Sequence, residues 1–256
     1  MPKKSIPLDP ESLVQTSDLK PHWTFANFIA TPATSNLLSV ARKVADFPGS
    51  AHNPFLLYGA PGAGKTHLLH AIVHAVLVNR PTTRVALIGA ERFTSGLLAA
   101  YNRNTLEPFR KFFLNLDVML LDDFSFLDGK EAVQSELSDI LKQMVSAKRQ
   151  VLIATSAASS PGKWQRGFLP ELKSFLLSGA CLAVDCPEQL SPDNIAAKAR
   201  QLEVELPTEV VACIFSARVT NFRLLEGIIL RLHAISNLTD VPISVSLAQD
   251  CLRDLE

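Results

Sequence analysis

Short apolar runs recur along the chain, and segments with helical spacing lie between them. Runs that are apolar throughout and alternate with helices are typical of parallel strands covered on both faces. The pattern therefore predicts an α/β unit built on a parallel sheet. The predicted strands are 54–58, 84–89, 117–123, 150–156 and 180–186.

The spacing of apolar residues also predicts the helical segments. In 130–147 the apolar positions recur at i, i+4, i+7 and i+8, which predicts one buried stripe. After Cys186 the strand-like runs stop, and helical patterns follow near 207–218, 221–237 and 245–255. Ser191 and Pro192 predict the N-cap and first residue of a further helix. The stripe of 130–147 comprises Val133, Leu137, Ile140, Leu141, Met144 and Val145.

This change of pattern places a domain boundary near Pro187. We expect a flexible tail at 1–20, an α/β unit at 21–187 and a small helical unit at 188–256. The 256 residues are 47% hydrophobic and 20% charged with a formal net charge of zero, which favours a globular protein. A neutral chain argues against binding duplex DNA by bulk charge. We see no apolar run of about 18 residues, so we expect a cytoplasmic protein without a membrane span.

The segment after the first run contains the most specific motif. Gly59, Gly64, Lys65 and Thr66 match G-x-x-x-x-G-K-[ST] between a predicted strand and a predicted helix. Backbone N–H groups and the helix N-terminus attract phosphate, Lys65 adds a charge, and Thr66 can hold Mg²⁺. We therefore predict binding of ATP or ADP with Mg²⁺. The predicted binding residues here are Gly59, Ala60, Pro61, Gly62, Ala63, Gly64, Lys65, Thr66 and His67.

Polar residues end two other predicted strands. Asp122 and Asp123 close the third run, where acidic side chains next to a phosphate loop suit Mg²⁺ and water. Neighbouring strand residues point to opposite faces, so one aspartate can face the metal while the other points elsewhere. A solvated turn is the alternative interpretation. Thr155 and Ser156 close the fourth run, where they could reach a γ-phosphate.

Three histidines lie on one face of the helix that follows the phosphate loop. His70 and His74 have the i, i+4 spacing of metal ligands, and His67 precedes them by one turn. Because no carboxylate completes the set, we interpret them as surface or packing residues.

Several of these segments together resemble the AAA+ domain of the DnaA and Hda family of bacterial replication proteins. The stretches "WTFANFIA", "NPFLLYGAPGAGKTHLLHA", "LLDDFSF" and "NFRLLEGIILRL" carry the resemblance, which is nearly collinear from about residue 21 to 256. It implies a P-loop NTPase with a five-stranded parallel αβα sheet and a helical lid. It also implies that Thr66 and Asp122 hold Mg²⁺, that Asp123 lies near the attacking water as the catalytic residue, and that Arg223 is the lid's sensor arginine. The "WTFANF" segment would lie near the adenine.

Four positions depart from the family. Phe175 stands where an arginine should reach a neighbour's ATP, and Glu171 stands at another arginine position. Ala157 replaces an aspartate, and a basic residue used on single-stranded DNA falls near Ala132. Residues 157–170 carry an insertion, so Arg166 is an alternative to the position of Phe175. The departures predict no self-built ATP filament and a slow ATPase at best, because an arginine supplied in trans is worth about 10³–10⁵ in rate.

The resemblance implies a role in replication initiation or its regulation. Family initiators continue into a domain that reads duplex DNA, and we expect this chain to lack it and to contact proteins such as a DnaA-type initiator. Lys3–Leu8 partly resembles a sliding-clamp peptide of a shorter relative, but a proline-containing tail is the simpler interpretation. The alternatives are an ATPase completed by a partner's arginine, a nucleotide-stabilised adaptor without turnover, or one part of a full initiator. The oligomeric state stays open.

Overall fold

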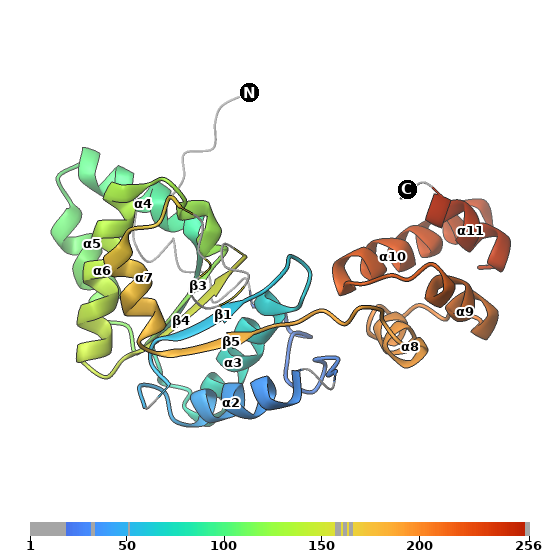
Figure 1. Ribbon diagram of the computed structural model, residues 1–256, viewed down its shortest axis with the longest axis horizontal. Coiled ribbons are helices and arrows are strands. Elements are labelled where there is room, and N and C mark those ends of the chain that lie inside the picture. The colour runs from blue at the N-terminus through green and yellow to red at the C-terminus, as the bar shows by residue number, and fades with distance from the viewer. Residues whose placement is uncertain are drawn as a thin grey trace. The chain divides into compact units, whose positions relative to one another are not determined.

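The computed structural model describes residues 19–31, 34–50, 52–156, 160, 163 and 166–253 (Figure 1). The chain divides into two compact units. The first holds the described residues of Met1–Phe28, Asn36–Gly59 and Lys65–Val184. The second holds those of Ile29–Ser35, Ala60–Gly64 and Asp185–Glu256. Within the described residues, no helix is both long and apolar enough to cross a membrane.

A five-stranded parallel sheet forms the centre of the first unit, in the order β2-β3-β4-β1-β5. Each predicted run contains one strand, which confirms the α/β class. The three inner strands consist mostly of apolar residues and are almost wholly buried, as expected for a sheet with helices on both faces. The strands are β1 (Phe55–Tyr58), β2 (Val85–Gly89), β3 (Val118–Asp122), β4 (Gln150–Thr155) and β5 (Ala180–Ala183).

Helices cover both faces of this sheet, with α2 and α3 on one side and α5, α6 and α7 on the other (Figure 1). Alternate strand residues point to opposite faces. Met119 and Ile153, for example, join the core cluster of the α4–α7 side, where Phe93, Phe109 and Phe113 pack together. The stripe predicted for 130–147 lies on α6, with Val145 only partly buried. The helices are α2 (Ser35–Asp46), α3 (Lys65–Asn79), α4 (Ala90–Asn102), α5 (Leu106–Leu114), α6 (Glu131–Ser146) and α7 (Pro170–Leu177).

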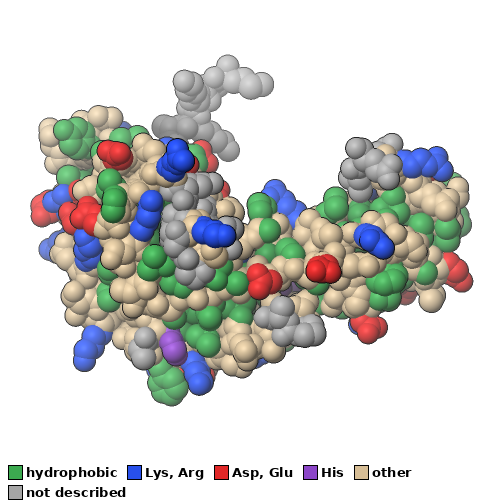
Figure 2. Space-filling view, in the orientation of Figure 1, with side chains coloured by type: hydrophobic (Ala, Val, Ile, Leu, Met, Phe, Trp, Pro, Cys, Tyr) green, Lys and Arg blue, Asp and Glu red, His purple; other side chains and the backbone are tan. Residues whose placement is uncertain are grey.

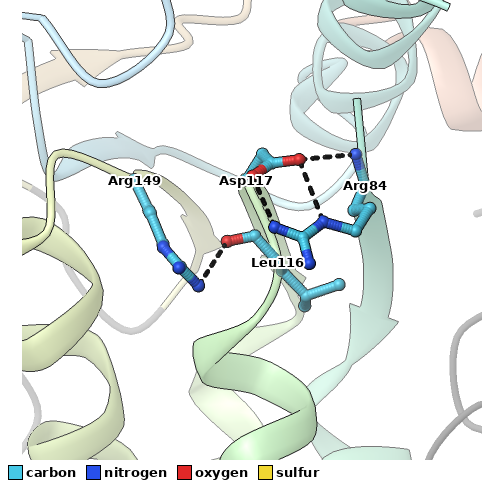
Figure 3. A network of polar contacts seen from close by, with 4 residues as sticks. All are labelled: Arg84, Leu116, Asp117 and Arg149. Carbon is cyan, nitrogen blue, oxygen red and sulfur yellow. Dashed lines mark hydrogen bonds and ion pairs between the residues drawn. The ribbon is translucent and has the colours of Figure 1, made fainter. Parts of the chain in front are cut away.

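Polar contacts join the segments that lead into the strands (Figure 3). The guanidinium of Arg84, just before β2, donates to both carboxylate oxygens of Asp117, just before β3, at 3.0 and 3.3 Å. The backbone N–H of Arg84 also donates to Asp117 at 2.9 Å. Arg149, just before β4, donates to the Leu116 carbonyl at 3.2 Å. The contacts fix the register of β2 and β3 at their amino ends.

The second unit contains four helices among its described residues: α8 (Pro192–Gln201), α9 (Thr208–Ser216), α10 (Phe222–Thr239) and α11 (Val245–Arg253). Ser191 caps α8 as predicted, and its hydroxyl accepts from the Asn194 N–H at 3.2 Å in a capping box. Apolar residues from all four helices form one core. On α10, Leu225 and Ile228 are buried in this core, whereas Leu224 is 36% exposed.

Candidate functional site

The predicted phosphate loop runs from the carboxyl end of β1 to the amino end of α3. Gly62 and Gly64 have φ values of 80° and 100°, in the region that side chains with a Cβ avoid. Lys65 and Thr66 open α3, whose first N–H groups lack helical partners and favour an anion. The Lys65 ammonium donates to the Gly59 carbonyl at 2.8 Å, so its charge lies beside the start of the loop.

The two residues predicted to hold Mg²⁺ are in contact. The Thr66 hydroxyl donates to the carboxylate of Asp122, and the N–H of Asp123 donates to Asp122 Oδ1 at 2.8 Å. Burial raises the pKa of Asp122, and the hydrogen bond from Thr66 opposes this rise. A hydroxyl and a carboxylate at the head of a phosphate loop are hard oxygen ligands, so this pair fits Mg²⁺ that also binds phosphate.

Asp123 does not continue the strand. Its φ of 51° and ψ of 44° are left-handed, and it precedes the short 3-10 helix η3 (Phe124–Leu127). The strand alternation predicted for the two aspartates therefore ends at Asp122. Asp123 Oδ1 accepts from the Ser125 hydroxyl at 2.9 Å, and Ser125 Oγ lies 3.2 Å from Ser156 Oγ at the end of β4. Sequence reasoning named Ser156 but missed its contact with Ser125.

His67 contacts the aromatic segment that precedes α2. Its ring stacks on Trp23, with centroids 5.6 Å apart and planes 6° apart, and meets the edge of Phe28 at 5.3 Å. Its Nε2 lies 3.0 Å from the Thr24 carbonyl oxygen. His67 therefore joins the phosphate-loop helix to the "WTFANF" segment.

The other two histidines of α3 contact Lys20, which lies just before that segment. His70 is 5% exposed, and its Nδ1 accepts from the Lys20 N–H at 3.3 Å. His74 Nε2 lies 2.9 Å from the Lys20 carbonyl oxygen. The described residues contain no group of three or more His, Cys, Asp or Glu side chains able to hold a metal. All three histidines contact residues between Lys20 and Phe28.

Arg223 lies in the second unit, which also includes loop residues Ala60–Gly64. Within that unit, a Cβ at Gly62 would lie 2.9 Å from Asn221 Oδ1 and 3.0 Å from Arg223 Cβ, so the loop tip contacts the start of α10. Asn221 caps α10 by accepting from the Leu224 N–H at 2.8 Å. Sequence reasoning missed this role, although asparagine before a helix is an N-cap signal.

Phe175 and Glu171, which we expect at the family's arginine positions, both lie on α7. Phe175 is partly buried against the core of the α/β unit. The Glu171 carboxylate lies 3.7 Å from the Lys142 ammonium of α6 and remains largely exposed. Both side chains therefore have partners within their own chain. Arg166, the alternative position, is exposed.

Ala132 and Ala157 are the other two positions at which we expect the chain to differ from the family. Ala132 is exposed in the first turn of α6. Ala157 lies outside the described residues, as does the clamp-like stretch Lys3–Leu8.

Gln134 anchors the segment that leads into α7. Its side chain is fully buried on α6, and its amide nitrogen donates to the carbonyls of Leu127 and Gly167 at 2.7 Å each. Its amide oxygen accepts from the Leu169 N–H at 2.7 Å. The sequence pattern carried no signal for this role, because a lone glutamine in a helix is usually exposed.

A hollow of about 930 Å³ lies between α5 and α6, away from the predicted site residues. Arg110 and Lys111 line it together with Glu107 and Asp139, so its charge is mixed. The Arg110 guanidinium pairs with Glu136, and this hydrogen bond raises its pKa. On the face shown in Figure 2, basic and acidic side chains are likewise interspersed.

Comparisons with known proteins agree with this geometry. Residues 19–179 match the family model described as the bacterial DnaA ATPase domain. The chain is 35% identical over 254 residues to the chromosomal replication initiator protein DnaA of Chloroflexus aggregans. The match covers 99% of this chain and 52% of that protein, so the chain spans about half its length.

Solved structures of DnaA proteins also resemble this chain. Domain III of the Thermotoga maritima replication initiation protein DnaA matches with a TM-score of 0.84 and 30% identity, over 92% of this chain and 98% of that one. A replication initiator DnaA bound to AMPPCP and single-stranded DNA matches with a TM-score of 0.73 and 28% identity, over 84% of this chain and 66% of that one.

Proposed function

Because the chain belongs to the bacterial DnaA ATPase domain family, we propose that it binds ATP or ADP with Mg²⁺ in the initiation of bacterial chromosomal replication or its regulation. The contact between Thr66 and Asp122 beside the phosphate loop carries the proposal. It joins two residues distant in sequence into a metal-binding pair where the motif predicts phosphate. The structural relative that holds AMPPCP supports the same assignment.

In this proposal each site residue has a role that follows from its chemistry. The backbone of Gly59–Gly64 and the ammonium of Lys65 bind the phosphates, and Thr66 and Asp122 hold the metal. Bound Mg²⁺ would neutralise charge on the outer phosphates. His67 acts indirectly in this proposal, because its ring is stacked on Trp23 and so holds the segment that would lie near the adenine.

The chain's two parts have separate roles in the proposal. With the bounds expected from the sequence pattern, we assign nucleotide binding to residues 21–187 and the role of the lid to residues 188–256. Arg223 senses the nucleotide from the lid, and its proximity to Gly62 at the loop tip supports this.

We propose that hydrolysis by the isolated protein is slow. Phenylalanine has neither charge nor hydrogen-bond donor, so Phe175 cannot stabilise a transferring phosphoryl group on a neighbour. Its packing against the core and the pairing of Glu171 with Lys142 support this assignment. A partner's arginine would then complete an ATPase, and without one the protein is a nucleotide-stabilised adaptor. Phosphate release measured with and without the partner separates these two functions.

The proposed partner is a DnaA-type initiator in the cytoplasm. We expect no sequence-specific binding to duplex DNA, because the chain is neutral overall and the face shown in Figure 2 carries interspersed basic and acidic side chains. Specific sites usually bind at about 10⁻⁸–10⁻¹¹ M at physiological salt. An affinity in that range for a replication origin, with much weaker binding to random DNA, would contradict this expectation.

The decisive test of nucleotide binding is calorimetry of ATP and ADP with Mg²⁺ on Lys65→Ala. A charge-assisted hydrogen bond contributes about 1.5–3 kcal/mol, so affinity should fall about 10- to 100-fold. Lys43→Ala on α2 is the matched control, because it removes an exposed lysine from another helix. Unchanged affinity in Lys65→Ala would place the nucleotide elsewhere.

A further inference from the structure

Three side chains form a hydrogen-bonded row where β3 and β4 end. Asp123 Oδ1 accepts from the Ser125 hydroxyl at 2.9 Å, and Ser125 Oγ lies 3.2 Å from Ser156 Oγ. Asp123 and Ser125 flank the first residue of η3, whereas Ser156 directly follows β4. The row therefore links two elements that only the folded sheet brings together.

The direction of each hydrogen bond follows from counting hydrogens. A serine hydroxyl carries one hydrogen and can accept through its lone pairs. Since Ser125 gives its hydrogen to Asp123, Ser156 must be the donor to Ser125. The row thus runs from Ser156 through Ser125 to the carboxylate of Asp123, and each hydroxyl orients the next group.

The sheet order places this row beside the phosphate loop. β4 lies between β3, which carries Asp122, and β1, which leads into the loop. Thr155, the residue before Ser156, is the register partner of Tyr58, the residue before Gly59. Ser156 therefore ties the turn at Asp123 to the strand next to the loop.

We propose that Ser125 is a positioning residue for Asp123 and that Ser156 fixes Ser125 in place. The inference rests on the proposed nucleotide site. In hydrolysis there, the oxygen of a water bonds to the terminal phosphorus, the bond from phosphorus to the ADP oxygen breaks, and the water's proton passes to Asp123. Ser125 touches none of the reacting atoms. It holds Asp123 through Oδ1, which leaves Oδ2 as the oxygen that accepts the proton.

The turn at Asp123 explains why such support matters. The residue is exposed and left-handed, so a free carboxylate there would sample several rotamers. One hydrogen bond from a fixed hydroxyl selects a rotamer before the reaction begins. Small misplacements of a reacting group can cost about 100-fold in rate.

The test is single-turnover hydrolysis of ATP with protein in excess, because this assay resolves slow rates. Ser125→Ala should lower the rate constant about tenfold, the effect expected for one lost hydrogen bond to a charged group. ATP affinity should stay within about twofold, because Ser125 is placed to act on Asp123 and not on the nucleotide. Ser125→Thr, which keeps the hydroxyl, should restore most of the rate, and Ser156→Ala should give a smaller loss than Ser125→Ala.

Two further variants serve as references for the rate constant of hydrolysis. Asp123→Asn defines the rate without the base, and Ser216→Ala on α9 removes an exposed serine hydroxyl that donates to the Ala212 carbonyl. A wild-type rate in Ser125→Ala would overturn the inference, as would equal losses in Ser125→Ala and Ser125→Thr. A wild-type rate no faster than Asp123→Asn would also overturn it, because Asp123 would then have no role to support. Failure of the nucleotide site itself is recognised separately, by unchanged ATP affinity in Lys65→Ala.

Discussion

Replacing Gln134 by methionine should destabilise the α/β unit without changing its shape. Methionine is unbranched and close in volume, so it fills the same space on α6 but cannot make hydrogen bonds to both carbonyls and the N–H. The lost partners are the carbonyls of Leu127 and Gly167 and the N–H of Leu169, each 2.7 Å from the glutamine amide.

The expected magnitude follows from these three hydrogen bonds. Each contributes about 1 kcal/mol net, and Gln134 is fully buried, so the free energy of unfolding should fall by about 3 kcal/mol. At about 2–4 °C per kcal/mol for a chain of this size, Tm should drop by about 6–12 °C. Local opening should be clearest at the Leu169 amide, which loses its acceptor.

Thermal unfolding followed by circular dichroism gives Tm, and hydrogen exchange gives the protection of Leu169. Gln143→Met is the matched control, since Gln143 is exposed on the same helix. It should leave both readouts near the wild-type values. If Gln134→Met unfolds within about 2 °C of that control and Leu169 keeps its protection, the amide contacts do not hold the segment before α7.

Phe175→Arg should increase ATP-dependent oligomer mass and phosphate release, because it restores a charged donor. If the wild type already forms ATP-dependent oligomers that hydrolyse ATP, and Arg166→Ala abolishes both, then Arg166 fills this role instead. Arg223→Ala should leave the circular dichroism spectrum intact but reduce the difference in protease protection between the ATP-bound and ADP-bound protein. If that difference is unaltered, Arg223 is a surface residue without a sensing role. The hydrogen bond from Arg84 holds the pKa of Asp117 below its usual value, so this pair contributes stability above pH of about 4 that is lost as pH falls through the folded pKa. The urea midpoints of wild type and Arg84→Gln should therefore differ at pH 7 and converge in acid, and a constant difference would mean that Arg84 acts through packing.

The apolar pattern alone determined much of the architecture. Strands buried on both faces need continuous apolar runs, and each of the five predicted runs contains one strand. Helix α6 and the capped start of α8 at Ser191 were predicted for similar local reasons, because a buried stripe and a cap depend on residues within a few turns. The phosphate loop is local too, since its glycines, lysine and threonine all lie within the short stretch Gly59–Thr66.

The tertiary structure decided which distant residues meet. No periodicity predicts that His67 stacks on Trp23, or that the carbonyl of Gly167 binds the amide of Gln134. Such contacts depend on which strands become neighbours, and β4 is inserted between β1 and β3 although it follows both in the chain.

The candidate site shows both kinds of information. Lys65, Thr66 and Asp122 could be named from motif and strand ends. The turn at Asp123 and its link through Ser125 to Ser156 could not, because they require a left-handed residue after β3 and the end of β4 beside it. Local sequence sets backbone preference and the burial pattern, whereas hydrogen bonds between distant side chains exist only once the sheet has assembled.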